Sequence, residues 1–137
     1  MDLIERRALL VIGNNPDKQL DYLVTLTGHL PGGGGGTGSG RARQVVEMRY
    51  VPDKHILQAR SFGTYLEALS TQIWDSPEDL AVTVLSDINN EVITRWVQIA
   101  ISVPELQHHA VETHAVVIED RQPEWDNPAL LTRLVRL

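Results

Sequence analysis

The spacing of apolar residues changes twice along this 137-residue chain, and this change limits the folds open to it. Residues 20–27 and 44–51 have a period of two, in which alternate side chains form two separate sets. This period predicts strands, because successive strand residues point to opposite faces. Residues 62–92 follow helical spacing, and 96–103 and 109–120 return to alternation. The predicted order is therefore strand, strand, helix, helix, strand, strand.

That order predicts an α+β domain with a four-stranded antiparallel sheet and two helices on one face. Among a few apolar residues, the opposite face carries the polar side chains Thr25, Glu47, Arg49, Gln98 and Ser102. A polar sheet face with no cover of its own suits a wet lumen between several subunits. We therefore expect an oligomeric barrel.

Two helices, each with one apolar stripe, are expected between the two pairs of strands. The apolar stripe of the first helix is Phe62, Tyr65, Leu66, Leu69 and Ile73. The second helix begins after Ser76, a favourable N-cap, and runs to about Val92. Its expected buried stripe is Ala81, Leu85, Ile88 and Val92.

Two further segments have a distinctive composition. The glycine-rich stretch 32–40 should be a mobile loop between two strands, because it offers no side chains to pack. It lacks the Gly-Lys-Ser/Thr ending of a nucleotide phosphate loop. Residues 128–137 should form a short C-terminal helix, whose leucines can pack on this subunit or on a neighbour.

Length and charge restrict the kinds of partner. The chain suits a single domain, 1–137, and its formal charge of −6 argues against a nucleic-acid or anionic-membrane surface. The apolar run Ala8–Ile12 is too short for a signal peptide or a membrane span, so we expect a cytoplasmic protein. The chain has no cysteine, which excludes disulfides and thiolate chemistry.

One junction resembles a known family. Tyr50-Val51-Pro52-Asp53, followed by Leu57-Gln58-Ala59-Arg60-Ser61-Phe62-Gly63-Thr64-Tyr65-Leu66, is similar to the strand-to-helix junction of the 7-cyano-7-deazaguanine reductases of queuosine biosynthesis. The resemblance spans most of Asn15–Pro104. It implies the tunnelling fold shared with GTP cyclohydrolase I and 6-pyruvoyltetrahydropterin synthase, in which subunit sheets form a barrel with purine or pterin sites at the interfaces.

The catalytic loop of that family is replaced here. The resemblance implies a cysteine that attacks the substrate nitrile and an aspartate that handles the proton, but these positions fall at or next to Gly35 and near Ala42. We therefore expect no catalytic residue. Gln58, Arg60 and Gly63 stand where the family has Glu, Lys and Lys, so the nicotinamide cofactor is not carried over and the cofactor stays unknown.

Two acidic residues are candidate ligand-binding groups. Glu78 lies beside the family's substrate-binding glutamate with a shift of one residue, which implies that it holds the N–H edge of a purine-like base. Its alternative role is to stabilise the helix dipole. Glu112 shares a predicted strand face with His114 and can point into the lumen, or it is an ordinary exposed charge.

Histidines and tryptophans suggest no further site. The chain has no His-x-His pair, so we expect no metal site of the three-histidine type seen in the pyruvoyltetrahydropterin branch. The histidines compared with that site are His29, His108, His109 and His114. Trp74, Trp96 and Trp125 are expected to be structural.

Three functions remain open. The first is a degenerate 7-cyano-7-deazaguanine reductase-like protein that binds a purine- or deazapurine-like small molecule, or assembles with an active paralogue, without reducing a nitrile. The second is a tunnelling-fold enzyme of deazapurine or pterin metabolism with cysteine-independent chemistry. The third is a structural oligomer without a ligand. The expected partners are a small heterocycle and further subunits, either identical or paralogous.

Overall fold

The computed structural model describes residues 2–30, 43–104 and 108–134. In these ranges the chain forms an α+β domain around a four-stranded antiparallel sheet, as the change in apolar spacing predicted. The predicted mobile loop 32–40 lies outside the described residues. No helix in the described ranges is long and apolar enough to cross a membrane.

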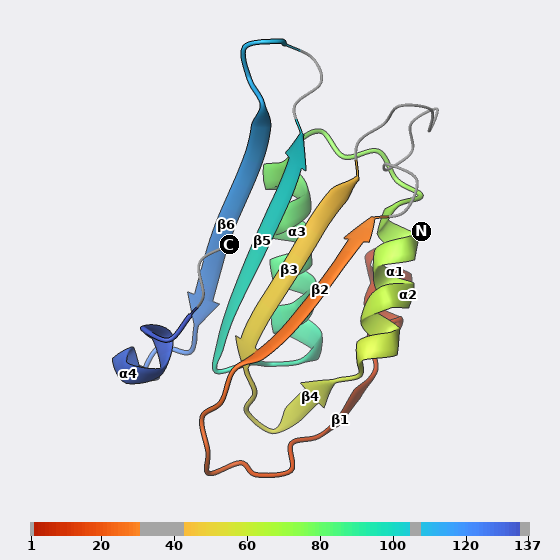
Figure 1. Ribbon diagram of the computed structural model, residues 1–137. Coiled ribbons are helices and arrows are strands. Elements are labelled where there is room, and N and C mark those ends of the chain that lie inside the picture. Colours follow the sequence, from red (N-terminus) through yellow and green to blue (C-terminus); the bar gives the residue numbers. More distant parts are fainter. Residues whose placement is uncertain (1, 31–42, 105–107, 135–137) are drawn as a thin grey trace.

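The sheet has the strand order β2-β3-β5-β6, and every neighbouring pair is antiparallel (Figure 1). The strands are β2 (Val24–Leu30), β3 (Gln44–Val51), β5 (Trp96–Pro104) and β6 (Thr113–Arg121). In the centre, Met48 of β3 lies opposite Leu26 of β2 and Ile99 of β5. The outer sides of β2 and β6 are the two edges of this sheet.

Helix α3 (Pro77–Glu91) packs on one face of the sheet and closes the core. Burying apolar strand and helix surface together is the main stabilising contribution in such a layer. The sheet residues that face it are fully or almost fully buried, and they are Val46, Met48, Tyr50, Val97, Ile99 and Ile101. From α3 the buried apolar residues are Leu80, Ala81, Val84 and Ile88.

Helix α2 (Ala59–Leu69) lies beside β2 at the edge of the sheet (Figure 1). The approach is close: a Cβ atom on Gly28 would lie 2.6 Å from the Leu66 side chain, so this position needs glycine. The predicted stripe is buried from Phe62 to Leu69, but its extension to Ile73 is wrong. The helix ends at Leu69, whose carbonyl accepts the Trp74 indole N–H at 2.9 Å, and Ile73 is 77% exposed.

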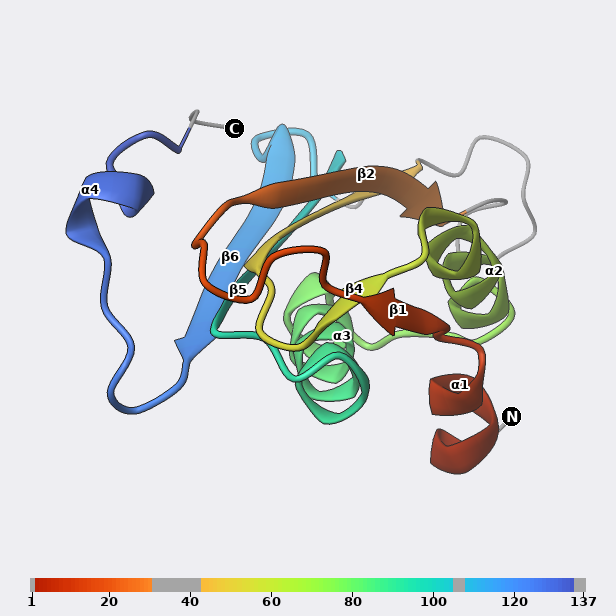
Figure 2. The same cartoon turned by 90° about the horizontal axis from the view of Figure 1, so that it is seen from below.

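The opposite face of the sheet is open. Figure 2 shows α2 and α3 on one side of the sheet, and no element among the described residues lies across the other side. The residues expected on this face do alternate with the buried ones, since Glu47 and Arg49 flank Met48 and Gln98 and Ala100 flank Ile99.

Three short elements were not predicted. They are α1 (Leu3–Ala8) and the strands β1 (Ile12–Asn14) and β4 (His55–Leu57), which pair with each other as a separate two-stranded sheet (Figure 1). The Tyr50 hydroxyl accepts the Leu57 N–H at 2.9 Å and so connects β4 to the main sheet.

Two predicted strand boundaries are wrong for identifiable reasons. The first strand was expected over 20–27, but Arg95 binds the Leu20 carbonyl and the Asp21 side chain, so this segment is held as a loop and β2 starts at Val24. The last strand was expected over 109–120. His108 instead accepts hydrogen bonds from the backbone N–H groups of Ala110 and Val111, which forms a turn before β6.

A buried carboxylate joins helices α1, α2 and α3. Asp87 of α3 is 0% exposed and accepts hydrogen bonds from Arg6 Nε at 2.6 Å and Arg7 Nε at 2.8 Å, both on α1. The Tyr65 hydroxyl of α2 donates to it at 2.6 Å. Burial disfavours the charged form of Asp87, but the hydrogen bonds from Arg6, Tyr65 and Arg7 outweigh it and lower the pKa.

Replacing Asp87 by Ala should lower the free energy of unfolding by about 3–5 kcal/mol, because two guanidinium groups would stay partly buried without their acceptor. Urea denaturation measures this loss. Asp87→Asn is the matched control, since it keeps the shape and one oxygen acceptor, and it should lose less. A loss below about 1 kcal/mol for Asp87→Ala, the level of an exposed ion pair, would contradict this role.

The stabilisation of the fold by Asp87 depends on pH, and the direction of this dependence follows from the pKa shift. Because the folded-state pKa of Asp87 is lowered, its stabilisation is present above the pKa of the unfolded chain and is lost as the pH falls through the folded-state pKa. The stability difference between the wild type and Asp87→Ala should therefore shrink in acid.

Candidate functional site

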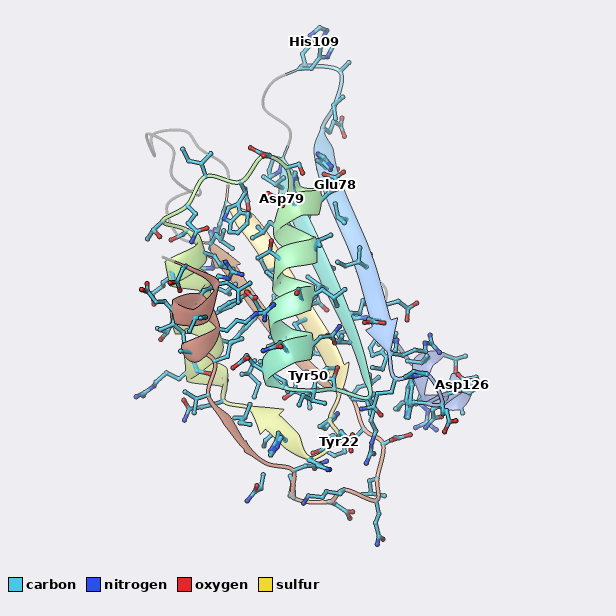
Figure 3. The ribbon with its side chains drawn as sticks, turned by 180° about the vertical axis from the view of Figure 1, so that it is seen from behind. Tyr22, Tyr50, Glu78, Asp79, His109 and Asp126 are labelled. Carbon is cyan, nitrogen blue, oxygen red and sulfur yellow. The ribbon has the colours of Figure 1, made fainter. Side chains whose placement is uncertain are left out.

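The first turn of α3 places two acidic side chains at one end of the sheet. The Ser76 hydroxyl accepts the Asp79 N–H at 3.1 Å, and Pro77 occupies the first helical position, so the local sequence fixes where the helix begins. Glu78 and Asp79 follow and are both exposed. Figure 3 shows them at the upper end of α3, close to the start of β6.

His114 of β6 holds the Glu78 side chain. The distance from His114 Nε2 to Glu78 Oε2 is 2.8 Å, and the Glu78 side chain remains 57% exposed. The hydrogen bond from His114, followed by that from the Glu78 backbone N–H, lowers the pKa of Glu78 below its ordinary value. This end of α3 therefore presents an ionised carboxylate to solvent in a fixed position.

The sequence grouped Glu112 and His114 on one strand face, and Glu112 was interpreted either as pointing into the lumen or as an ordinary exposed charge. Val116 and Ile118, which share a face with His114, pack against the core beneath α3. His114 therefore lies on the helix side of the sheet. Glu112 is exposed in the segment before β6, and His114 is the residue that contacts Glu78. The role of Glu112 in ligand binding stays a prediction.

The pairing of Glu78 with His114 was not predicted, although the sequence contains a signal for it. The alternation of 113–121 groups His114 with Val116 and Ile118, so the buried face of the strand was already defined. The first turn of α3 covers the end of that face. An ionisable residue at this position is within reach of a helix-start acid.

An ion pair lies on the open face of the sheet. Arg49 Nε donates to Glu47 Oε1 at 2.8 Å, and the two side chains are only 9% and 18% exposed. Arg49 lies opposite Gln98, and Gln98 lies opposite Glu119, so one polar row crosses β3, β5 and β6. The row continues to the Trp96 indole N–H, which donates to Glu119 at 2.5 Å.

The three tryptophans, which were expected to be structural, differ in how deeply they are buried. Trp96 is 1% exposed, whereas Trp74 and Trp125 are half-buried.

Among the described residues, no group of three or more His, Cys, Asp or Glu side chains could hold a metal ion. The chemistry available at the end of α3 is therefore that of a carboxylate acceptor supported by an imidazole.

No model of a known protein family matches the sequence, and a search of curated proteins finds no match. The fold and the described geometry define an α+β domain whose antiparallel sheet is covered by helices on one face only.

Replacing His114 by Ala should raise the pKa of Glu78 towards the ordinary glutamate value, because the largest favourable contribution to the ionised form is removed. An NMR titration of the side-chain carboxyl carbon measures this shift. His29→Ala is the control, since His29 lies on β2 and should leave Glu78 unchanged. An unaltered Glu78 titration in His114→Ala would show that the two side chains are not paired in solution.

Proposed function

We propose that this protein is a non-catalytic binding subunit, a degenerate relative of the 7-cyano-7-deazaguanine reductases that binds a purine- or 7-deazapurine-like heterocycle at a subunit boundary. The observation that carries the proposal is the state of Glu78. Its carboxylate is ionised, more than half exposed and positioned by His114. A carboxylate in this state accepts the paired N–H groups on the edge of such a base through charge-assisted hydrogen bonds.

The arrangement of the sheet supports a site between subunits. The domain has two strand edges, β2 and β6, and a face without cover among the described residues. Joining the edges of several copies into a barrel pairs the free backbone groups and turns the open face towards a lumen. The Arg49–Glu47 ion pair and Gln98 give this face polar groups, which suit a hydrated lumen.

The composition of the chain explains why the proposed subunit does not reduce a nitrile. Covalent attack on a nitrile carbon requires a thiolate, and no cysteine occurs in the 137 residues. Recognition of the heterocycle requires only hydrogen-bond acceptors and a pocket wall, which this fold can supply at a boundary between copies or beside an active paralogue.

Replacing Glu78 by Gln should weaken binding of 7-cyano-7-deazaguanine or guanine by about tenfold or more, because the amide turns an N–H group towards the donors of the base. Isothermal titration calorimetry measures the affinity. Asp79→Asn is the matched control, since it removes one negative charge from the same helical turn and should leave the affinity unchanged. Equal affinities in the wild type and Glu78→Gln would limit Glu78 to a helix-start role.

The purified chain should not oxidise NADPH in the presence of 7-cyano-7-deazaguanine, because it cannot form the covalent thioimide. The absorbance of NADPH at its long-wavelength maximum measures the reaction. Consumption that depends on the nitrile, and that persists after repeated purification, would contradict the non-catalytic assignment.

A further inference from the structure

The outer edge of β6 is a long, regular strand edge. All nine residues of β6 pair with β5 on the inner side, in one uninterrupted register. No described strand pairs with the outer side. Proteins commonly protect such an edge with proline, lysine or a bulge, and β6 has none of these. Its outer backbone N–H and C=O groups are therefore accessible to another strand.

Helix α4 (Pro128–Leu131), which follows β6, does not cover this edge. The helix begins where the sequence predicted, with the Asn127 side chain accepting the Leu130 N–H at 3.1 Å, but it ends at Leu131 instead of 137. Figures 1 and 2 show it beyond the end of β6, and none of its residues is buried. Among the described residues, the edge of β6 is thus open.

One flank of α3 runs along β6. Near the start of the helix, Glu78 contacts His114. About three turns later, the Asn89 side-chain amide donates to the Asp120 carboxylate at 2.8 Å. The flank between these two contacts and the edge of β6 form one continuous side of the domain.

This side of the domain is polar at both ends and apolar in the middle. Val82 and Leu85 share the flank of Glu78 and Asn89, because all four positions follow helical spacing. Val82 is 58% exposed and Leu85 is half-buried. On the open face of β6, Val117 is also more than half exposed.

We propose that β6 pairs antiparallel with β6 of a second copy of this chain, about a two-fold axis at Val117. The pairing joins two four-stranded sheets into one continuous sheet, with both copies of α3 on the same face. Each copy presents the same surface to the other, as in most two-fold dimers.

The sequence of β6 suits pairing with itself. In this register Val117 lies opposite its own copy, and the other pairs are Val116 with Ile118, Ala115 with Glu119, His114 with Asp120, and Thr113 with Arg121. Like charges directly opposite each other would destabilise a strand pair, and none occur here. A parallel pairing would instead place each acid beside its own copy.

The spacing of the helices supports the same partner. Helix α3 lies over β5 and β6 of its own sheet, so two copies of α3 would be separated by two strand spacings, about 9–10 Å. Packed helices are usually about 8–10 Å apart. Val82 and Leu85 of one copy then meet the same two residues of the other copy, and their apolar surface is buried.

The edge at β2 is a poorer partner for this surface. It is flanked by α2, whose exposed residues include Arg60, Thr64 and Glu67. Pairing β6 with β2 of another copy would set the apolar middle of the α3 flank against this polar helix surface. Pairing β6 with itself sets apolar residues against apolar residues.

The pairing adds residues of the second copy to the candidate site. Because His114 lies opposite Asp120 across the axis, Asp120 and Asn89 of the second copy come close to Glu78 and His114. An amide side chain carries both a donor and an acceptor, as the edge of a purine-like base does. The use of these groups for a heterocycle rests on the proposed function, whereas the strand pairing requires no ligand.

The absence of cysteine allows a direct test by disulfide trapping. Opposite residues of antiparallel strands have Cα atoms about 4.5–5.5 Å apart, within the disulfide range of about 4.4–6.8 Å. Oxidised glutathione should therefore convert Val117→Cys into a covalent dimer, seen by non-reducing electrophoresis. Val45→Cys is the matched control, because Val45 is an exposed valine of the inner strand β3 and should stay monomeric under these denaturing conditions. No dimer of Val117→Cys, or equal dimer in both variants, would overturn the proposal.

A charge exchange at Val117 tests the two-fold register. In sedimentation velocity without a heterocycle, Val117→Lys or Val117→Glu alone should raise the dissociation constant by about tenfold or more, since two like charges would then lie opposite each other. A mixture of the two variants should associate again, because each lysine then faces a glutamate. A head-to-tail contact between β6 and β2 would give no such recovery.

Circular dichroism separates lost pairing from failed folding. The Val117 variants should keep the unfolding temperature of Val45→Lys, because both side chains are exposed in the single chain. A monomeric wild type, or a mixture of Lys and Glu variants that stays apart, would overturn the pairing. Since no heterocycle is present in these measurements, a failed ligand titration would count against the proposed function alone.

Discussion

Burial of one sheet face beneath α3 is the interaction on which the rest of the structure depends. Since neighbouring strand residues point in opposite directions, placing Met48 and Ile99 in the core commits Arg49 and Gln98 to the other face. The open face carries this polar row together with apolar residues such as the exposed Val45 and Val117. The domain also has two strand edges that its described residues do not pair.

The position of α3 also decides which side chains are available for function. The helix is fixed on its inner side by the sheet and by Asp87, to which α1 and α2 donate hydrogen bonds. With α3 held in this way, its first turn brings Glu78 to His114 at the end of β6. The carboxylate that we assign to ligand binding is thus positioned by the same packing that builds the core. This connection links the stability of the domain to its proposed function.

Much of the fold was predictable because long segments follow one period. Val46 to Tyr50 and Val97 to Ile101 alternate without interruption, so both central strands were identified. Shorter elements, such as β1 with three residues, are too brief for a period to emerge. Element ends depended on distant partners: Arg95, which belongs to no predicted motif, holds residues 20–21 as a loop. The Glu78–His114 contact joins residues far apart in sequence, and only the packing of α3 against β6 reveals it.

Native mass spectrometry of the purified protein, alone and after incubation with 7-cyano-7-deazaguanine, guanine or a pterin, tests the central claim most directly. It reports subunit number and bound small molecules in the same spectrum, so assembly and recognition are observed together. The account predicts an oligomer that retains a purine- or deazapurine-like heterocycle. A monomer that takes up none of these compounds would contradict it.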